Sequence, residues 1–342
     1  MNTSLSHIVS EIAKLPLEDQ RKIQSELNNL LAGEVPGNSN VIEIRKKTFE
    51  KKDLMCPHCD SSEIIGFGNY KGGKRYRCKS CHRTFNDLTG TSISNLHKKE
   101  SFVEYFKCLS NGLALRKSAE QVGISLQTSF DWRHKILNAF KEVGCVKLEG
   151  IMEGDETFFL YSEKGNKKIE GRNPRKRGGN AKSKGISNEQ VAVLVAADRY
   201  DNMIIEPACI GRIKTKDIEE VLGKWIDKKS GVLCTDYHVS YQGFAMKKEL
   251  KHVKLKGSIK QHVKENIYHI QNVNNIHSMM KKWMVKFDGV ATKYLENYMN
   301  WYRITRKLGE GESMANEYLT FALLSNKSYT PAKMIKQHKF RT

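Results

Sequence analysis

Two aspartates occupy positions where a buried strand would carry apolar side chains. Asp155 lies within the segment EGIMEGDETFFLYS, and Asp236 ends the apolar run that starts at Val232. A buried, uncompensated carboxylate is costly, so such aspartates are usually paired, hydrogen-bonded or bound to metal. Strand alternation places Glu153 on the same face as Asp155 and Glu156 on the opposite face. Carboxylates from adjacent strands can hold a pair of divalent ions, and oxygen ligands favour Mg²⁺ or Mn²⁺ over zinc.

A helix expected around residues 268–283 offers further polar groups. Asn274, His277 and Lys281 lie on one face of this helix. Asn274 or His277 could coordinate metal or the scissile phosphate, and Lys281 supplies a cation about one turn further on. The alternative is a polar helix face that is simply solvated.

Two Cys-x-x-Cys pairs lie close together in the sequence, separated by a segment that has the pattern of a β-hairpin. Each pair forms a tight turn that presents two thiolates to one metal ion, and two pairs complete a tetrahedral site. The pattern predicts a zinc ribbon, with redox dithiols or a disulfide pair as the alternatives. Four cysteines leave no open coordination position, so the zinc would be structural and not catalytic. The predicted zinc ligands are Cys56, Cys59, Cys78 and Cys81.

Residues 97–140 have a helical pattern, and the part after Ala114 is typical of a helix-turn-helix. Gly123 fits the turn, and Ser125 fits the N-cap of the second helix. Such a helix places polar and cationic side chains in a DNA major groove. A plain helical linker is the alternative interpretation. The predicted DNA contacts on this helix are Gln127, Thr128, Ser129, Arg133 and Lys135.

From about residue 148 the pattern changes to strands alternating with helices, which predicts an α/β domain with a mixed sheet. A basic, glycine-rich excursion, residues 163–186, separates the first two strands. It is interpreted as a loop that follows DNA phosphates, with an ordinary solvated loop as the alternative. Its densest cations are Arg172, Arg175, Lys176, Arg177, Lys182 and Lys184. Strands are expected at 149–162, 190–199, 203–211 and 231–238, and helices at 217–229, 270–285 and 292–306.

Composition narrows the class of protein. The 342 residues carry 58 Lys and Arg against 38 Asp and Glu, a formal charge of +20. A hydrophobic content of 39% is too high for a disordered polyelectrolyte. No apolar run reaches the roughly 18 residues of a membrane span, and the first residues do not resemble a secretory signal. We therefore expect a cytoplasmic protein with a polyanionic partner, most commonly nucleic acid.

The order of zinc ribbon, helix-turn-helix and α/β domain resembles the bacterial insertion-sequence transposases of the ISXO-type group. The resemblance runs from about residue 50 to about 305. Its most specific parts are the segment Gly154–Thr157, the pair Thr235–Asp236 and the helix at 269–283. It implies a ribonuclease-H-like catalytic domain of the DDE class that uses Mg²⁺ or Mn²⁺. It also implies a nucleoid-associated homodimer acting on double-stranded DNA, at element ends and at a target.

The third metal ligand departs from the commonest family pattern, which has a glutamate with a lysine seven residues later. Counting back seven residues from Lys281 leads to Asn274, and His277 is the other candidate. We favour His277 because imidazole is the stronger ligand. A neutral third ligand makes the site less anionic, so a second metal ion should bind more weakly.

The function expected from the resemblance is DNA transposition through binding of terminal inverted repeats, phosphodiester hydrolysis and strand transfer. The alternatives are an inactive DNA-binding regulator derived from a transposase and a metal-dependent nuclease of the same fold. The expected domains are an N-terminal helical segment and linker (1–50), zinc ribbon (51–90), helix-turn-helix region (91–147), catalytic domain (148–310) and C-terminal tail (311–342).

Overall fold

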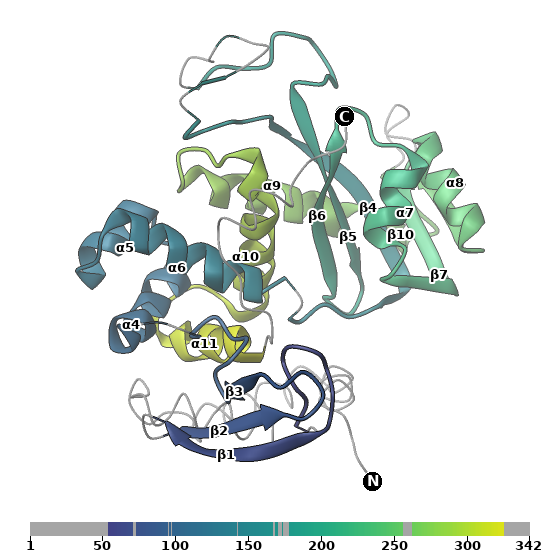
Figure 1. Ribbon diagram of the computed structural model, residues 1–342. Helices are drawn as coiled ribbons and strands as arrows, with labels where there is room; N and C mark the ends of the chain where they lie inside the picture. The colour runs from purple at the N-terminus through teal and green to yellow at the C-terminus, as the bar shows by residue number, and fades with distance from the viewer. Residues whose placement is uncertain are drawn as a thin grey trace.

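The computed structural model is built around a mixed five-stranded sheet (Figure 1). The strand order is β6-β5-β4-β7-β8, with β4 antiparallel to β5 and parallel to β7. The strands are β4 (Leu148–Leu160), β5 (Gln190–Asp198), β6 (Met203–Ile210), β7 (Ile226–Asp236) and β8 (Lys251–Leu255). The structure describes residues 54–70, 73–94, 96, 98–141, 143–166, 168–169, 173, 178–255 and 262–324. The helices expected within residues 5–33 lie outside this part of the chain.

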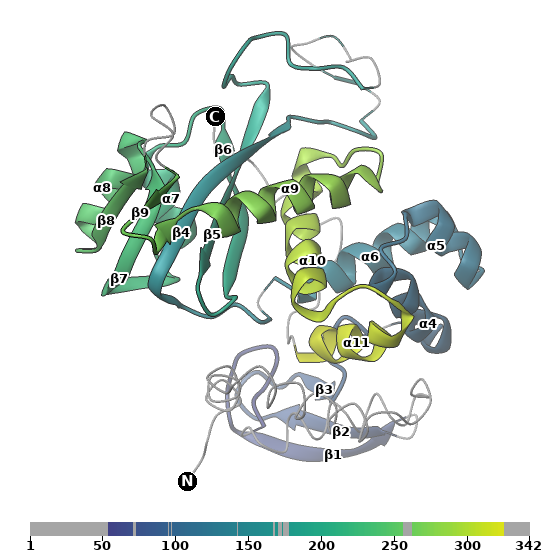
Figure 2. The same ribbon diagram turned by 180° about the vertical axis from the view of Figure 1, so that it is seen from behind.

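Helices cover both faces of the sheet, which explains why β5 is apolar at almost every position. Val191, Val193 and Val195 share one core with α9 (Gln271–Val285) and α10 (Leu295–Leu308). The alternate residues of β5 face α7 (Thr215–Leu222) and α8 (Val239–Lys247). Seen from behind, α9 crosses the sheet over β4 and β5 (Figure 2). The α/β prediction is therefore confirmed.

One predicted helix is shorter than its apolar pattern indicated. The helix expected over 217–229 ends at Leu222, and Ile226 already pairs with Leu148 as the first residue of β7. Ile226 is fully buried. A short apolar segment fits both helical and strand periodicity, so pairing with the rest of the sheet decides between them.

A second group of helices extends the α9–α10 side of the molecule. It consists of α4 (Lys99–Ser110), α5 (Leu115–Val122), α6 (Leu126–Ala139) and α11 (Ala315–Leu324). Part of the segment expected to be a C-terminal tail is thus a helix, and α11 packs on α4 and α6. The apolar side chains of α4, α6, α10 and α11 belong to the same core as β5. These helices are therefore fixed against the sheet.

Three antiparallel strands form a small sheet of their own, below α4 and α11 in Figure 1. They are β1 (Ile64–Tyr70), β2 (Gly73–Cys78) and β3 (Thr84–Asn86). A further hairpin, β9 (Val263–Lys264) with β10 (Tyr268–His269), leads directly into α9. Short 3-10 helices span Thr292–Tyr294 and Glu312–Met314. Within the described residues, every helix is too short or too polar to cross a membrane.

Candidate functional site

Asp155 and Asp236 lie side by side on the two central parallel strands. Gly154 and Thr235 are the last partners in the ladder between β4 and β7, and each aspartate is the next residue on its strand. Because parallel strands keep their register, the carboxylates emerge next to each other. Both side chains are partly exposed, so the site is open to a ligand.

His277 approaches Asp155 from α9. Its Nδ1 lies 3.8 Å from Oδ2 of Asp155, too far for a hydrogen bond. The side chain is 11% exposed, and within the described part of the chain no group hydrogen-bonds its buried Nε2. Burial, together with the charge of Lys281, lowers the pKa of His277 to about 4. The imidazole is therefore neutral at physiological pH, which is the form that binds metal.

Asp155 has an unusually high proton affinity. Burial raises its pKa to about 7, and the charges of Glu156 and Asp236 add to the effect. Glu156 points to the other side of the sheet, where its carboxylate accepts a hydrogen bond of 2.7 Å from the Tyr241 hydroxyl. Glu153 points to the α9 side, as Asp155 does, so the predicted alternation along β4 is confirmed. A cation between Asp155 and Asp236 would relieve their repulsion.

The other two predicted residues of α9 are exposed. Asn274 lies one turn before His277, and Lys281 lies one turn after it. Lys281 is close enough to influence the pKa of His277. Asn274 is therefore available to a ligand, but His277 is the residue of α9 that the structure brings to Asp155.

The cysteine pairs form the tightest group of possible metal ligands. Among the described residues, only Cys56, Cys59, Cys78 and Cys81 bring three or more His, Cys, Asp or Glu ligand atoms within 4.8 Å of one another. The Sγ atoms of Cys56 and Cys81 are 3.6 Å apart, as are those of Cys59 and Cys78. Tetrahedral bonds of about 2.3 Å place two sulfurs about 3.8 Å apart, so the group fits a zinc ion. The possible ligand atoms of Asp155, Asp236 and His277 do not all lie within this distance of one another.

The local backbone favours a thiolate at Cys78. The backbone N–H of Cys81 donates to the Sγ of Cys78 at 3.5 Å, and this bond, with further hydrogen bonds from Cys59 and Ser80, lowers the pKa of Cys78 to about 6. Burial raises the pKa of Cys56, and partial desolvation together with the neighbouring thiols raises that of Cys59, so the structure favours one thiolate in the group. Thiolate is the form of cysteine that binds metal.

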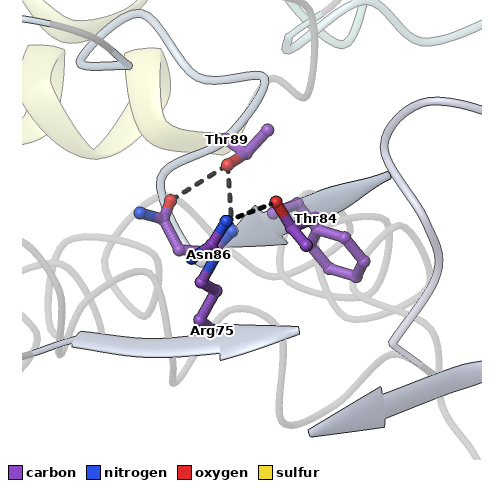
Figure 3. A pocket seen from close by; sticks show the side chains of 5 residues that line it. Arg75, Thr84, Asn86 and Thr89 are labelled. Carbon is purple, nitrogen blue, oxygen red and sulfur yellow. Dashed lines mark hydrogen bonds between the residues drawn. The ribbon is translucent and has the colours of Figure 1, made fainter. Parts of the chain in front are cut away.

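A polar cavity of about 420 Å³ lies on the small sheet, lined by residues of β2, β3 and the turn that follows β3 (Figure 3). Arg75 reaches it from β2 and donates to the Thr84 hydroxyl at 2.9 Å. Asn86 accepts a hydrogen bond of 3.0 Å from Thr89 on the same rim. The Arg75 guanidinium also lies 5.4 Å from the centre of the Phe67 ring. This surface combines cationic, hydroxyl and aromatic groups.

The turn between α5 and α6 has the predicted local chemistry. Gly123 takes a left-handed conformation with φ of 66°, and the Ser125 side chain accepts from the backbone N–H of Thr128 at 3.1 Å. The roles of Gly123 and Ser125 are confirmed. Gln127 is exposed, whereas Thr128 is half-buried.

Two of the predicted DNA contacts on α6 are wrong. Ser129 is fully buried and bonds the Tyr105 hydroxyl at 2.8 Å. Arg133 is also fully buried, donates to Ser118 at 2.8 Å and stacks 4.8 Å from the centre of the Trp301 ring. Both point into the core that α6 shares with α4 and α10, because the buried face of a helix is decided by its neighbours.

The remaining predicted DNA contacts differ in how exposed they are. Lys135 is half-buried, and its ammonium donates to the Ser94 carbonyl at 2.6 Å. Lys182 and Lys184 are exposed. The predicted contacts Arg172, Arg175, Lys176 and Arg177 lie outside the described residues.

Sequence reasoning missed the groups that hold α9 in place. Glu153 is almost fully buried and contacts both α9 and Arg199. Glu153 was predicted to share a face with Asp155, but the sequence does not show which helix lies on that face. Two acidic residues at alternate strand positions, with an arginine after the neighbouring apolar strand, were the available signal.

Comparison with known proteins places the chain among transposases. Residues 147–303 match the family described as ISXO2-like transposase domain. Over 78 residues, the chain is 33% identical to insertion element iso-IS1N protein InsA of Shigella dysenteriae, covering 22% of this chain and 82% of that protein. The chain belongs to the ISXO2-like transposase family.

A further relative and a solved structure match longer parts of this ISXO2-like chain, at lower sequence identity. An uncharacterized protein in transposable element ISH50 of Halobacterium salinarum is 28% identical over 152 residues, 44% of this chain and about half (51%) of that relative. The structure titled pre-cleavage Mos1 transpososome aligns over 63% of this chain and 75% of its own, with 10% identity and a TM-score of 0.21. That TM-score is too low to establish a shared fold.

The burial of Arg133 predicts a loss of stability on substitution. Arg133→Ala in the ISXO2-like chain should lower the free energy of unfolding by about 2–4 kcal/mol, because it removes a cation–π contact and leaves a cavity. Gln127→Ala, on the exposed face of the same helix, should change it by less than about 0.5 kcal/mol. Urea unfolding followed by circular dichroism measures both. A stable Arg133→Ala protein with weakened DNA binding would restore Arg133 as a DNA contact.

The raised pKa of Asp155 predicts a pH-dependent stability in the absence of Mg²⁺ and Mn²⁺. The folded chain keeps a proton on Asp155 up to pH about 7, whereas the unfolded chain loses it near pH 4. Between pH 5.5 and 7 the free energy of unfolding should therefore fall by about 1 kcal/mol per pH unit through this group. Asp155→Asn should remove that fall. Parallel urea-unfolding profiles for the two proteins would contradict the assignment.

Proposed function

We propose that the chain is the DDE-type transposase of an insertion sequence, with a ribonuclease-H-like catalytic domain. The observation that carries the proposal is the convergence of Asp155, Asp236 and the neutral His277 at one edge of the sheet, in a chain of this family. Water would attack the phosphodiester at the element end and release a 3′-hydroxyl. That hydroxyl would then attack a target phosphodiester, releasing the target's own 3′-hydroxyl.

Asp155, Asp236 and His277 would hold Mg²⁺ or Mn²⁺, with Asn274 as the alternative third ligand. Bound there, the divalent ions would polarise the phosphate and stabilise the charge on the attacking and leaving oxygens. Asp155, Asp236 and His277 lie less close together than the cysteine sulfurs, a spread that would suit a pair of divalent ions better than a single one. The exposed Lys281 would position the phosphate.

The cysteine group would hold structural Zn²⁺ and so form a zinc ribbon. We infer that this ribbon, together with α5 and α6 as a helix-turn-helix, binds double-stranded DNA at the element ends. Exposed Lys74 and Lys79 of the ribbon and Gln127 of α6 support this role. Cutting two element ends together favours a homodimer. Binding to DNA favours a location at the nucleoid in the cytoplasm.

Zinc removal should unfold the ribbon alone. Its core consists of Cys56, Cys78 and Phe85, which is too small to fold without the metal. A strong chelator should therefore remove hydrogen-exchange protection from residues 64–86 while β5 keeps its own. Elemental analysis should give one zinc per chain before chelation. Protection of the ribbon that survives zinc loss would contradict the assignment.

Loss of either aspartate should abolish DNA joining. Asp155→Asn and Asp236→Asn should reduce strand transfer of labelled element ends into a plasmid at least 10³-fold in Mg²⁺, because each change removes a charged ligand. Asp227→Asn is a matched control, since Asp227 lies on β7 but forms an exposed ion pair with Lys147. Unchanged joining by the aspartate variants would refute the proposal.

The same assay separates the rival functions. A transposase-derived regulator would bind element ends but neither cut nor join them with either metal ion. A nuclease of the same fold would cut the ends in Mg²⁺ or Mn²⁺ without producing joined products.

Substitution on α9 should identify the third ligand. If His277 is the ligand, His277→Ala should lower the joining rate by about 10²-fold or more, whereas Asn274→Ala should lower it by less than tenfold. The reason is that His277 contacts Asp155, and Asn274 lies one turn away on the exposed face. The reverse order of effects would assign the role to Asn274. Circular dichroism of both variants checks that α9 remains folded.

A further inference from the structure

A buried carboxylate caps α9 from a distant part of the chain. Oε2 of Glu153 accepts hydrogen bonds from the backbone N–H groups of Asn272 at 2.9 Å and Val273 at 3.1 Å. Its Oε1 accepts from the Asn272 side-chain amide at 3.1 Å. The residue before the helix, Ile270, provides no side-chain cap. Glu153 therefore satisfies two of the free amides of α9 and complements the positive end of its dipole.

Arg199 compensates the charge of Glu153. Its guanidinium forms an ion pair with Oε1 of Glu153 and donates to the Ile267 carbonyl at 3.1 Å. Arg199 directly follows β5, and Ile267 lies in the turn that leads to β10. The pair thus connects β4, the end of β5 and the entry to α9. Removing one partner of such a buried pair leaves an uncompensated charge.

The spacing of this anchor matches the spacing of the site. Glu153 and Asp155 are two residues apart on one strand face, about 6.6 Å. Val273 and His277 are four residues apart on α9, about 6 Å. Fixing the start of α9 to Glu153 therefore brings His277 level with Asp155.

Glu153 is unsuited to hold metal itself. Its side chain is 99% buried, and both oxygens are occupied by donors from Arg199 and α9. Any effect on the reaction must act through the groups that it holds in place.

We propose that Glu153 is a positioning residue for the third ligand, because its carboxylate fixes the start of α9 and thereby sets His277 against Asp155. The inference rests on the proposed transposase function. It assigns Glu153 and Arg199 to the geometry of the site and not to contact with DNA or metal.

Glu153→Gln in the full-length, zinc-loaded chain tests this role. The rate constant kcat for cleavage of element ends should fall about 10- to 100-fold, since a displacement of 1 Å can cost about 10². The KM for end DNA should stay within twofold, because the DNA-binding elements are untouched. The matched control is Glu310→Gln, which breaks the exposed ion pair of Glu310 with Lys286 and should change neither constant.

Two further measurements do not depend on catalytic activity. Hydrogen exchange at the Asn272 and Val273 amides should accelerate in Glu153→Gln relative to wild type. Manganese binding, followed by electron paramagnetic resonance, should weaken about tenfold, with Asp155→Asn as the reference for loss of the site. Faster exchange with unchanged kcat and manganese affinity would overturn the proposal, because Glu153 would then only stabilise the helix.

A second substitution covers the case in which Glu153→Gln fails to fold. Arg199 is 25% exposed, and Arg199→Met removes the counter-charge while keeping the aliphatic part of the side chain. The same fall in kcat at constant KM is expected, with partial recovery in Arg199→Lys. Unchanged kcat in Arg199→Met would also overturn the proposal. If the wild-type protein neither cuts nor joins, the transposase function fails, whereas the exchange and manganese measurements still test the anchor.

Discussion

The fold depends on how β4 accommodates three carboxylates within four residues of a central strand. The negative charge of Glu153 is compensated by Arg199 and by the backbone amides at the start of α9. The Glu156 carboxylate accepts a hydrogen bond from the Tyr241 hydroxyl on the opposite face. Among the described residues, Asp155 between them has no comparable side-chain partner, and burial raises its pKa to about 7. The strand thus uses its outer carboxylates to attach α9 on one face and α8 on the other. The central carboxylate is left for a ligand.

Helix α9 also connects the sheet to α10 and α6 through a shared core. The buried face of α9 packs, through Met280 and Trp283, into the core that contains α10. That core continues through Trp301 to Arg133 of α6. The helices expected to read DNA are therefore held by the same core as the sheet. DNA bound on α6 would lie at a set distance from Asp155, an arrangement that suits an enzyme cutting at a fixed position relative to its recognition sequence.

Sequence patterns predicted the parts of the site that depend on local chemistry. The spacing of the cysteine pairs, the cap at Ser125 and the alternation along β4 need only neighbouring residues, and the structure confirms each geometry. The burial of Ser129 and Arg133 could not be predicted, because helix α6 is polar on more than one face and the position of α10 decides which face is covered. The contact of Glu153 with α9 spans 119 residues and requires the strand order.

The formal charge of +20 is unevenly distributed along the chain. Cations lie on the ribbon and in the excursion between β4 and β5, whereas the acidic groups at the sheet edge are few and adjacent. Since Glu153 and Glu156 are already satisfied, the net negative charge available to metal comes mainly from Asp155 and Asp236. A neutral His277 adds a donor without adding charge. The site should therefore bind a second divalent ion weakly until a DNA phosphate contributes further negative charge, which would couple metal loading to the presence of substrate.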